Sequence, residues 1–267
     1  MDNLKPFLRW AGGKTWLLKH LSKYLPSNGF HDYHEPFLGG GSVFFSLRPK
    51  KAFLSDLNAD LIETYDQVKK NVEKVILELS KFENTADFYY EIRSTKFNEI
   101  AQNAAKFIYL NQTSFKGIYR VNLKVEYNVS FGYRTKWFFS AEGLRSISKS
   151  LANVELNHLD FTETLPNIKE NDLVFLDPPY TVTHNNNGFI KYNKKLFDLN
   201  SQYALSDYIN KVKNKGAYYI LTNAAHHNIE EIFTKKNDKI FELKRASLIG
   251  GKNSNRGKYA ELLITNI

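Results

Sequence analysis

The sequence predicts an α/β fold in which an open sheet is interrupted by a helical insertion. Short apolar runs of the kind that form buried strands occur near both ends of the chain, whereas residues 57–150 show apolar residues mainly at helical spacing. We therefore expect one domain made of residues 1–56 and 151–267, and a second, helical domain of residues 57–150. The runs that predict strands are 52–56, 154–156, 172–176, 217–222, 240–243 and 259–264.

The tetrapeptide Asp177-Pro178-Pro179-Tyr180 directly follows one of these runs. Two prolines end a strand abruptly, and ligands of open α/β sheets bind beyond the carboxyl ends of the strands. The Asp177 carboxylate and the Pro178 carbonyl are hydrogen-bond acceptors, and Tyr180 adds an aromatic face. Such a site suits a planar substrate that carries an amino group, such as a nucleobase. An ordinary turn is the alternative interpretation.

A glycine turn followed by an acid predicts a site for a nucleoside-containing ligand. The three glycines 39–41 lead into an apolar helix, and glycine lets a ligand approach the main chain closely. Asp56 ends the next predicted strand, and an acid at this place accepts hydrogen bonds from ribose hydroxyls. The strand before Phe37 is poorly marked, because Asp32 to His34 is not an apolar run.

A second glycine turn, Gly12-Gly13-Lys14, precedes residues 15–24, where the leucine spacing predicts a helix. A Walker phosphate loop requires a glycine where this chain has Leu8, so an ATPase is disfavoured. A glycine turn before a helix, with a lysine beside it, suits a carboxylate. Later in the chain, Asn200 is expected to cap a helix that Gly216 stops.

Composition favours a polyanionic partner and excludes several kinds of chemistry. Lys and Arg total 37 against 28 Asp and Glu, so the net charge is +9 and the pI is about 9.3. The chain has no cysteine, which excludes disulfides, thiolate zinc sites and cysteine nucleophiles. The histidines form no apparent metal set, and no signal peptide or membrane-spanning run is visible. We expect a cytoplasmic protein that makes no contact with a membrane.

The stretch 111–122 interleaves basic and amide side chains with aromatic residues. This pattern suits hydrogen bonds to base edges and stacking on bases. A solvated loop with a few buried rings is the alternative interpretation.

Taken together, Trp10-Ala11-Gly12-Gly13-Lys14, then Phe37-x-Gly39-x-Gly41, then Asp177-Pro178-Pro179-Tyr180 resemble the motifs of the Dam-type (alpha-group) DNA adenine N6-methyltransferases. The resemblance extends from Phe7 to Ile264, and residues 111–132 are similar to the hairpin with which that family reads DNA. Two departures are Lys116, where the family often has asparagine, and Ser130, where well-known members have proline.

The resemblance implies a Rossmann-like S-adenosylmethionine-dependent methyltransferase sheet, with residues 57–150 as the target-recognition domain. It implies S-adenosylmethionine as methyl donor, S-adenosylhomocysteine as product, no metal, and N6 of a flipped-out adenine in double-stranded DNA as acceptor, in a GATC-like site. The implied catalytic residues are Asp177, Pro178, Pro179 and Tyr180. The implied cofactor-binding residues are Trp10, Lys14, Phe37, Gly39, Gly41, Asp56, Asp160, Phe161 and Asp177. The DNA-contacting candidates are Arg9, Phe115, Lys116, Ile118, Arg120 and Asn122.

Other functions stay open at this point. Cytosine N4 methylation uses the same acceptor chemistry, although such enzymes more often have serine in place of Asp177, and protein glutamine methyltransferases usually have asparagine there. Cytosine C5 methylation is excluded because it needs a cysteine nucleophile. A catalytically silent DNA-binding module is disfavoured by the intact motifs. We further expect a bacterial, archaeal or phage-encoded monomer or weak dimer that acts without the cognate restriction endonuclease that could accompany it.

Overall fold

The structure is a computed structural model that describes residues 4–122, 126–134, 139–180, 197–234, 237–246 and 258–267. The polar loop predicted at 181–188 lies outside the described residues, as does nearly all of the glycine-rich loop predicted at 249–258. The chain forms two compact units, and each is described by itself below. Unit 1 is Met1–Leu18 with Leu38–His158, and unit 2 is Lys19–Phe37 with Leu159–Ile267. The predicted boundary between a catalytic and a DNA-reading domain remains a prediction.

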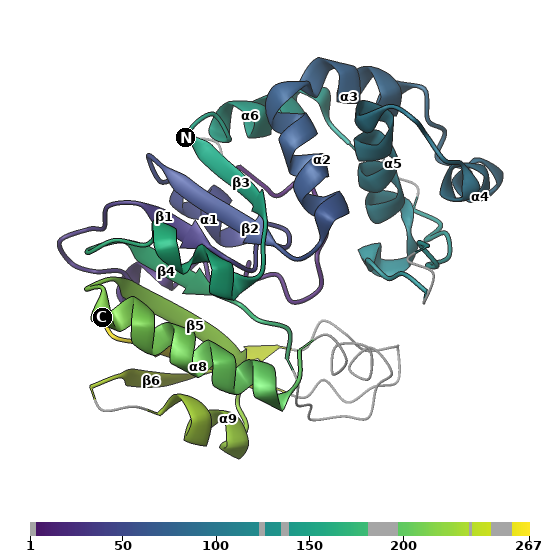
Figure 1. Ribbon diagram of the computed structural model, residues 1–267. Helices are drawn as coiled ribbons and strands as arrows, with labels where there is room; N and C mark the ends of the chain where they lie inside the picture. The colour runs from purple at the N-terminus through teal and green to yellow at the C-terminus, as the bar shows by residue number, and fades with distance from the viewer. Residues whose placement is uncertain (1–3, 123–125, 135–138, 181–196, 235–236, 247–257) are drawn as a thin grey trace. The chain divides into compact units, whose positions relative to one another are not determined.

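In the described part of the chain, seven strands form a sheet in the order β3-β2-β1-β4-β5-β7-β6. The pairs β2–β3, β1–β4 and β4–β5 are parallel, whereas β7 runs antiparallel to both β5 and β6 (Figure 1). This arrangement confirms the predicted α/β class and is consistent with a Rossmann-like methyltransferase sheet. The strands are β1 Tyr33–Glu35, β2 Ala52–Asp56, β3 Val154–His158, β4 Leu173–Leu176, β5 Tyr218–Ala224, β6 Lys239–Ala246 and β7 Lys258–Thr265.

Most helices of unit 1 lie within residues 57–150, where helical spacing predicted them, and α1 follows the glycine turn 39–41 as expected. In Figure 1, α2, α3 and α5 lie side by side, and their packed faces carry Leu61, Val68 and Ile108, all buried. The apolar pattern that runs from 61 to 79 belongs to two helices, because the backbone leaves helical geometry at Asn71. The helices are α1 Ser42–Leu47, α2 Ala59–Lys70, α3 Val72–Ser80, α4 Ala86–Ser94, α5 Ile100–Thr113 and α6 Ala141–Ser150, with the 3-10 helix η2 at Phe115–Gly117.

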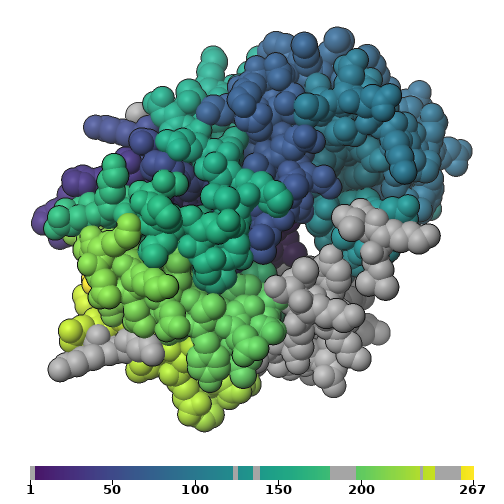
Figure 2. Space-filling model, viewed as in Figure 1, coloured from purple at the N-terminus to yellow at the C-terminus, as the bar shows by residue number. Residues whose placement is uncertain are grey.

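The core of unit 2 forms where α8 packs on the sheet. Leu205 and Val212 of α8 are fully buried against Leu221 of β5 and Ile264 of β7, and truncating such a leucine to alanine typically costs about 2–5 kcal/mol. Figure 2 shows the opposite face of α8, in green, open to solvent. The remaining elements are η1 Leu21–Tyr24, η3 Phe161–Asn167, α8 Leu199–Asn214 and α9 His227–Phe233.

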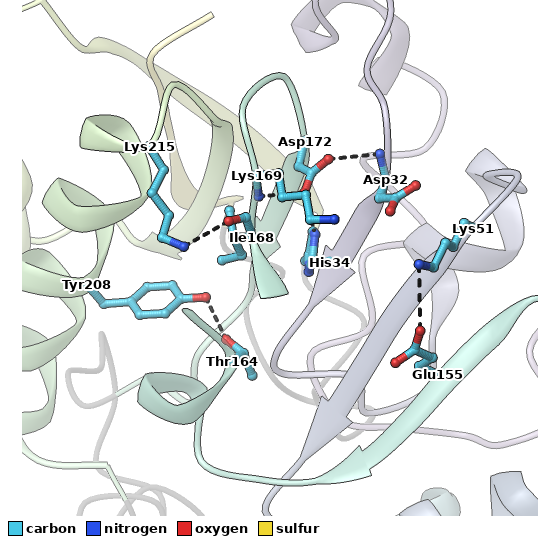
Figure 3. A network of polar contacts seen from close by, with 10 residues as sticks. All are labelled: Asp32, His34, Lys51, Glu155, Thr164, Ile168, Lys169, Asp172, Tyr208 and Lys215. Carbon is cyan, nitrogen blue, oxygen red and sulfur yellow. Dashed lines mark hydrogen bonds and ion pairs between the residues drawn. The ribbon is translucent and has the colours of Figure 1, made fainter. Parts of the chain in front are cut away.

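Strand β1 is short and polar in sequence, yet all three of its residues are buried. His34 Nε2 lies 2.9 Å from a carboxylate oxygen of Asp172, which also accepts hydrogen bonds from the backbone N–H groups of Asp32 and Lys169 (Figure 3). Tyr33 donates a 2.8 Å hydrogen bond to Glu35. Buried polar groups are tolerated when they are paired in this way, and apolar patterning cannot detect such a strand.

Two local predictions were wrong. Residues 15–24 form turns and the short η1 rather than a helix, with i→i+3 hydrogen bonds such as Leu17 N to Lys14 O, because so short a segment is marginal as an α-helix. Helix α8 is capped by Asp198 rather than Asn200, since the Asp198 carboxylate accepts a 2.8 Å hydrogen bond from Ser201 N. The predicted stop is confirmed, because Gly216 follows the helix with φ +74°.

Candidate active site and DNA-reading surface

In unit 1 the structure brings together Trp10, Gly39 and Asp56. Gly39 has φ +48°, and a Cβ atom there would lie 2.6 Å from Cδ1 of Trp10, so only glycine fits. Its N–H donates a 3.0 Å hydrogen bond to the Asp56 carboxylate at the end of β2. Burial raises the pKa of Asp56, and the hydrogen bonds from Gly39 N and Asn58 N oppose that shift. The result is a half-buried acceptor beside a glycine turn on which the Trp10 ring packs closely.

Lys14 is buried in the glycine turn that precedes η1. Its Nζ donates a 2.8 Å hydrogen bond to Gly12 O, and its backbone N–H bonds Ser42 Oγ at 3.2 Å. Gly41 begins α1 with φ +64°, and Tyr65 Oη would lie 2.9 Å from a Cβ at that position. The two glycine turns are thus joined within unit 1, as one compact backbone feature.

In unit 2 the aromatic candidates stack on each other. The rings of Phe37 and Phe161 have centroids 5.4 Å apart at 29°, and both pack against Phe197. The Asp160 carboxylate accepts hydrogen bonds from the N–H and hydroxyl of Thr162 and so caps η3. Its observed role is that of a cap, and a contact with a cofactor remains a prediction.

The tetrapeptide that follows β4 is held by two further residues of unit 2. Thr222 Oγ1 donates a 2.8 Å hydrogen bond to Asp177 Oδ1, and Tyr180 Oη donates a 2.7 Å hydrogen bond to Glu261 Oε2. Thr222 lies on β5 and Glu261 on β7, and both are buried. The two polar side chains of the tetrapeptide are therefore each hydrogen-bonded to a strand of the sheet, while Pro178 and Pro179 lie between them in the chain.

Arg9 is fixed in unit 1 by the end of α5. Asn111, fully buried, accepts a 2.7 Å hydrogen bond from Arg9 N and donates another of 2.7 Å to Arg9 O. The side chain passes over Gly117, where a Cβ would lie 2.7 Å from Arg9 Cδ and Nε. Burial, helped by the nearby charge of Arg134, lowers the pKa of Arg9, and its buried Nη1 has no hydrogen-bond partner among the described residues. Such a donor is ready for an acceptor from a ligand.

The segment after α5 exposes the next candidates. Phe115 is 50% exposed, and Lys116, at φ +57°, holds its ammonium 5.3 Å from the centre of that ring. Ile118 is half-buried, and its carbonyl accepts a 2.7 Å hydrogen bond from Tyr127. An exposed ring and a cation at the tip of this segment suit contact with bases and phosphates.

Antiparallel bridges join Val121 to Tyr127 and Ser114 to Phe131, so this region has the pairing of a hairpin, although residues 123–125 lie outside the described residues. The exposed Arg120 donates to Asn128 Oδ1 at 2.8 Å and to Asn128 O at 3.2 Å. Asn122 pairs with Glu126 through both backbone and side chain, which makes it a turn-forming residue in this structure.

Sequence reasoning missed three residues that hold the candidates in place: Asn111 as a clamp, Thr222 and Glu261. Glu261 had a visible signal, since it is the one acid in the apolar run 259–264. Within the described residues, no group of three or more His, Asp or Glu could hold a metal ion. No helix in that part of the chain is both long and apolar enough to cross a membrane.

Comparison with known families shows what kind of enzyme this chain is. Residues 10–247 match the model of the D12 class N6 adenine-specific DNA methyltransferases, which spans all of the motifs above. The chain belongs to this family. It is an enzyme that transfers a methyl group from S-adenosylmethionine to adenine N6 in DNA, so adenine rather than cytosine is the acceptor.

Relatives align along nearly the whole chain. It is 34% identical to the type II methyltransferase M1.LlaDCHI of Lactococcus lactis subsp. cremoris, over 99% of this chain and 96% of that protein. It is also 34% identical to the type II methyltransferase M.MjaIII of Methanocaldococcus jannaschii, over 98% and 99% of the two chains. The DNA adenine methylase of Escherichia coli K12 is 27% identical over 98% of this chain and 95% of its own. Bacterial and archaeal relatives thus share the full length of this methyltransferase.

Proposed function

We propose that this DNA methyltransferase flips its target adenine out of duplex DNA and methylates it within a GATC-like site, with the Asp177–Tyr180 tetrapeptide as the catalytic centre. The observation that carries the proposal is the Asp177 carboxylate, oriented by Thr222 at the carboxyl end of β4. Ligands of open α/β sheets bind at this end of the strands.

The residues of unit 1 fit one part of S-adenosylmethionine. Asp56 is a half-buried acceptor suited to ribose hydroxyls, and Gly39 lets the Trp10 ring pack closely on the main chain beside it. We propose Trp10 and Lys14 for the methionine end, and Gly41 as the start of the helix behind it. From unit 2, the proposed cofactor contacts are Phe37, Asp160, Phe161 and Asp177.

The cofactor supplies an activated methyl group, and the protein orients the acceptor. The amino group of adenine is a weak nucleophile because its lone pair is delocalised into the ring. Acceptors aimed at its two protons, the Asp177 carboxylate and the Pro178 carbonyl, favour a pyramidal nitrogen and stabilise the positive charge that develops there. Pro178 has no N–H that could compete. Removing such a preorganised partner typically costs about 10²–10³ in rate.

Tyr180 is proposed to stack on the flipped base. Adenine inside a duplex cannot be reached, and extruding it costs a few kcal/mol. A ring against the extruded base offsets part of this, by about 1–3 kcal/mol for base–aromatic stacking. Pro179 restricts the backbone before Tyr180 and so limits where that ring can lie.

The DNA sequence is proposed to be read by two arginines. Arg9 and Arg120 can each donate two hydrogen bonds to O6 and N7 of a guanine, which is the commonest specific contact to that base. Phe115, Lys116 and Ile118 would lie at the opened base pair or at a thymine methyl, with Asn122 shaping the hairpin. A guanine contact by Arg120 requires it to leave Asn128, its present partner.

The test is transfer of labelled methyl groups from S-adenosylmethionine to unmethylated duplex DNA, followed by nucleoside analysis and sequencing of the modified positions. We expect N6-methyladenine within one short motif, and loss of at least about 10²-fold in rate for Asp177→Ala. Asp207→Ala, which removes an exposed carboxylate from α8, is the matched control and should act like the wild type. Methylation of scattered adenines, or an active Asp177→Ala enzyme, would contradict the proposal.

A partner nuclease is expected to be dispensable. Two relatives are named type II methyltransferases, and those names include no nuclease. For this chain we propose activity as a monomer or weak dimer, without any added restriction endonuclease. Sedimentation of the active enzyme together with a turnover assay on the purified chain checks both points.

A further inference from the structure

Two buried polar side chains outside the recognised motifs contact the tetrapeptide, and both come from the antiparallel part of the sheet. Thr222 is 0% exposed and Glu261 is 2% exposed, and their partners are Asp177 and Tyr180. Neither belongs to the tetrapeptide or to a glycine turn. The burial of Glu261 needs an explanation, because burying a carboxylate in an apolar strand costs free energy unless it has a specific partner.

The register of the sheet places the two on the same face. Thr222 pairs with Leu263 across β5 and β7, and Ala224 pairs with Glu261. Directly opposed residues of an antiparallel pair project to the same side, and so do residues two apart along a strand. Thr222 and Glu261 are therefore diagonal neighbours on one face, and this pairing of strands sets their spacing.

We propose that Thr222 and Glu261 are positioning residues for the methyl-transfer site, with Glu261 fixing the ring of Tyr180 and Thr222 fixing the carboxylate of Asp177. This inference rests on the proposed roles of the tetrapeptide. In this proposal neither Thr222 nor Glu261 touches the reacting atoms, and each acts through its hydrogen-bonded partner.

Glu261 restricts the direction of the Tyr180 side chain. A tyrosine in the irregular segment that follows β4 can adopt several χ1 rotamers, and a hydrogen bond at Oη selects the one that points to Glu261. A stacking residue that is already in place does not lose rotamer freedom when the base arrives. The bond should therefore strengthen stacking on the extruded adenine without any change in the ring itself.

Thr222 restricts the carboxylate of Asp177 in the same way. Its hydroxyl donates to Oδ1, which fixes the plane of the carboxylate and thereby the direction of its oxygen atoms. Orientation of an acceptor toward the amino protons of the substrate is the proposed catalytic contribution of Asp177. Loss of the hydroxyl should lower kcat more than it weakens DNA binding.

The experiment uses the full-length enzyme with duplex DNA that carries 2-aminopurine at the target position, alongside methyl-transfer assays. The variants are Glu261→Ala, Glu261→Gln, Tyr180→Phe and the double variant Tyr180→Phe/Glu261→Ala. We expect Glu261→Ala and Tyr180→Phe each to lower kcat by about 10-fold or more, as befits a hydrogen bond to a charged group, and to change the 2-aminopurine fluorescence of the enzyme–DNA complex. Glu261→Gln keeps an acceptor for the tyrosine hydroxyl and should stay within about 10-fold of wild type.

The double variant decides between positioning and an independent role. If Glu261 acts through Tyr180, the double variant loses no more than the worse single variant. The proposal would be overturned if the losses in kcat of the two single variants multiply in the double variant. It would also be overturned if Glu261→Gln is as defective as Glu261→Ala. If Glu261→Ala does not fold, Glu261→Gln and Tyr180→Phe still test it, because equal 2-aminopurine signals in wild type and Tyr180→Phe would contradict an anchored ring.

Thr222 is tested with two substitutions that separate the effect of its hydroxyl from the effect of its shape. Thr222→Val removes the hydroxyl while keeping the shape, and Thr222→Ser keeps the hydroxyl. We expect Thr222→Val to lower kcat by about 10-fold or more with little change in the Kd for DNA, and Thr222→Ser to restore most of the rate. Equal rates for Thr222→Val and wild type would overturn this part. A wild-type enzyme inactive on every DNA would instead refute the proposed function, whereas the fluorescence comparison does not depend on turnover.

Discussion

Trp10 and Tyr119 stack with ring centroids 5.4 Å apart and planes 20° from parallel. Trp10 belongs to the glycine turn proposed to hold the methionine end of the cofactor, and Tyr119 directly precedes Arg120 in the hairpin proposed to read DNA. Phe107 of α5 lies on the same stack, 6.4 Å from Trp10. Within unit 1, the segment proposed to bind the cofactor and the segment proposed to read DNA are therefore in direct contact.

Replacing Tyr119 with alanine is expected to weaken cofactor binding, although Tyr119 is not proposed to touch the cofactor. An aromatic pair contributes about 0.5–1.5 kcal/mol beyond the area it buries, so the Kd for S-adenosylmethionine should rise by about 2- to 13-fold. Isothermal titration calorimetry without DNA measures this. Tyr119→Phe preserves the ring and serves as the control, and an unchanged Kd for the alanine variant would show that the stack does not position Trp10.

A second prediction concerns the glycine that faces Trp10. Gly39→Ala combines a φ of +48° with a Cβ 2.6 Å from the indole, so we expect the Kd for S-adenosylmethionine to rise by about tenfold or more, or about 1.4 kcal/mol. Gly29→Ala is a matched control, because Gly29 has φ +76° but nothing within 4 Å of its Cβ position. Both variants carry a left-handed strain of about 1–2 kcal/mol. The prediction fails if the two variants bind the cofactor equally well.

Gly117→Ala is expected to impair DNA reading and leave cofactor binding intact. The new Cβ would displace Arg9, whose Cδ and Nε lie 2.7 Å from that position. If Arg9 contacts a guanine, discrimination against a substituted base pair should fall by about 1–3 kcal/mol at one position of the recognition site. Methylation rates on a set of single-base variants of the site measure this. A uniform loss over all sites would point to a phosphate contact for Arg9 instead.

The pair formed by His34 and Asp172 predicts how stability depends on pH. Burial alone would raise the pKa of Asp172, but hydrogen bonds from His34 and from Lys169 N and Asp32 N outweigh it and lower that pKa. A carboxyl whose folded pKa lies below its unfolded value of about 3.9 stabilises the fold above that pH, and this stabilisation is lost as the pH falls through the folded pKa.

We therefore expect the free energy of unfolding of the wild type to decrease as the pH drops below about 4. In Asp172→Asn the free energy of unfolding should depend less on pH over the same range. At pH 7 the variant should be less stable by about 1–3 kcal/mol, because the asparagine amide keeps only one of the two oxygens that accept hydrogen bonds from buried partners. Urea denaturation between pH 3 and pH 7 measures both effects, with Asp207→Asn as an exposed control. Parallel curves for wild type and Asp172→Asn would refute the assignment.

The α/β class, the helices within residues 57–150 and the family motifs could all be predicted from the sequence. These features depend on local properties of the chain. Apolar periodicity predicts the strand Ala52–Asp56 and helix α5, proline marks the end of β4, and glycine marks the turn at Gly39 and the helix end at Gly216. Where a local rule was marginal it failed, as in the short segment 15–24 and in the choice of Asn200 as the cap of α8, where the structure has Asp198. Roles implied by the motifs for Asp160 and Asn122 remain predictions, since their observed contacts cap a helix and form a turn.

The residues from distant parts of the chain that hold the candidate site together became visible only in the folded chain. Asn111 clamps Arg9 from 102 positions away, and Glu261 holds Tyr180 from 81 positions away. Strand β1 could likewise be recognised only in the structure, where His34 is paired with Asp172. The physical reason is that a buried polar side chain is acceptable only beside its partner, and that partner is chosen by strand order and register rather than by the neighbouring sequence.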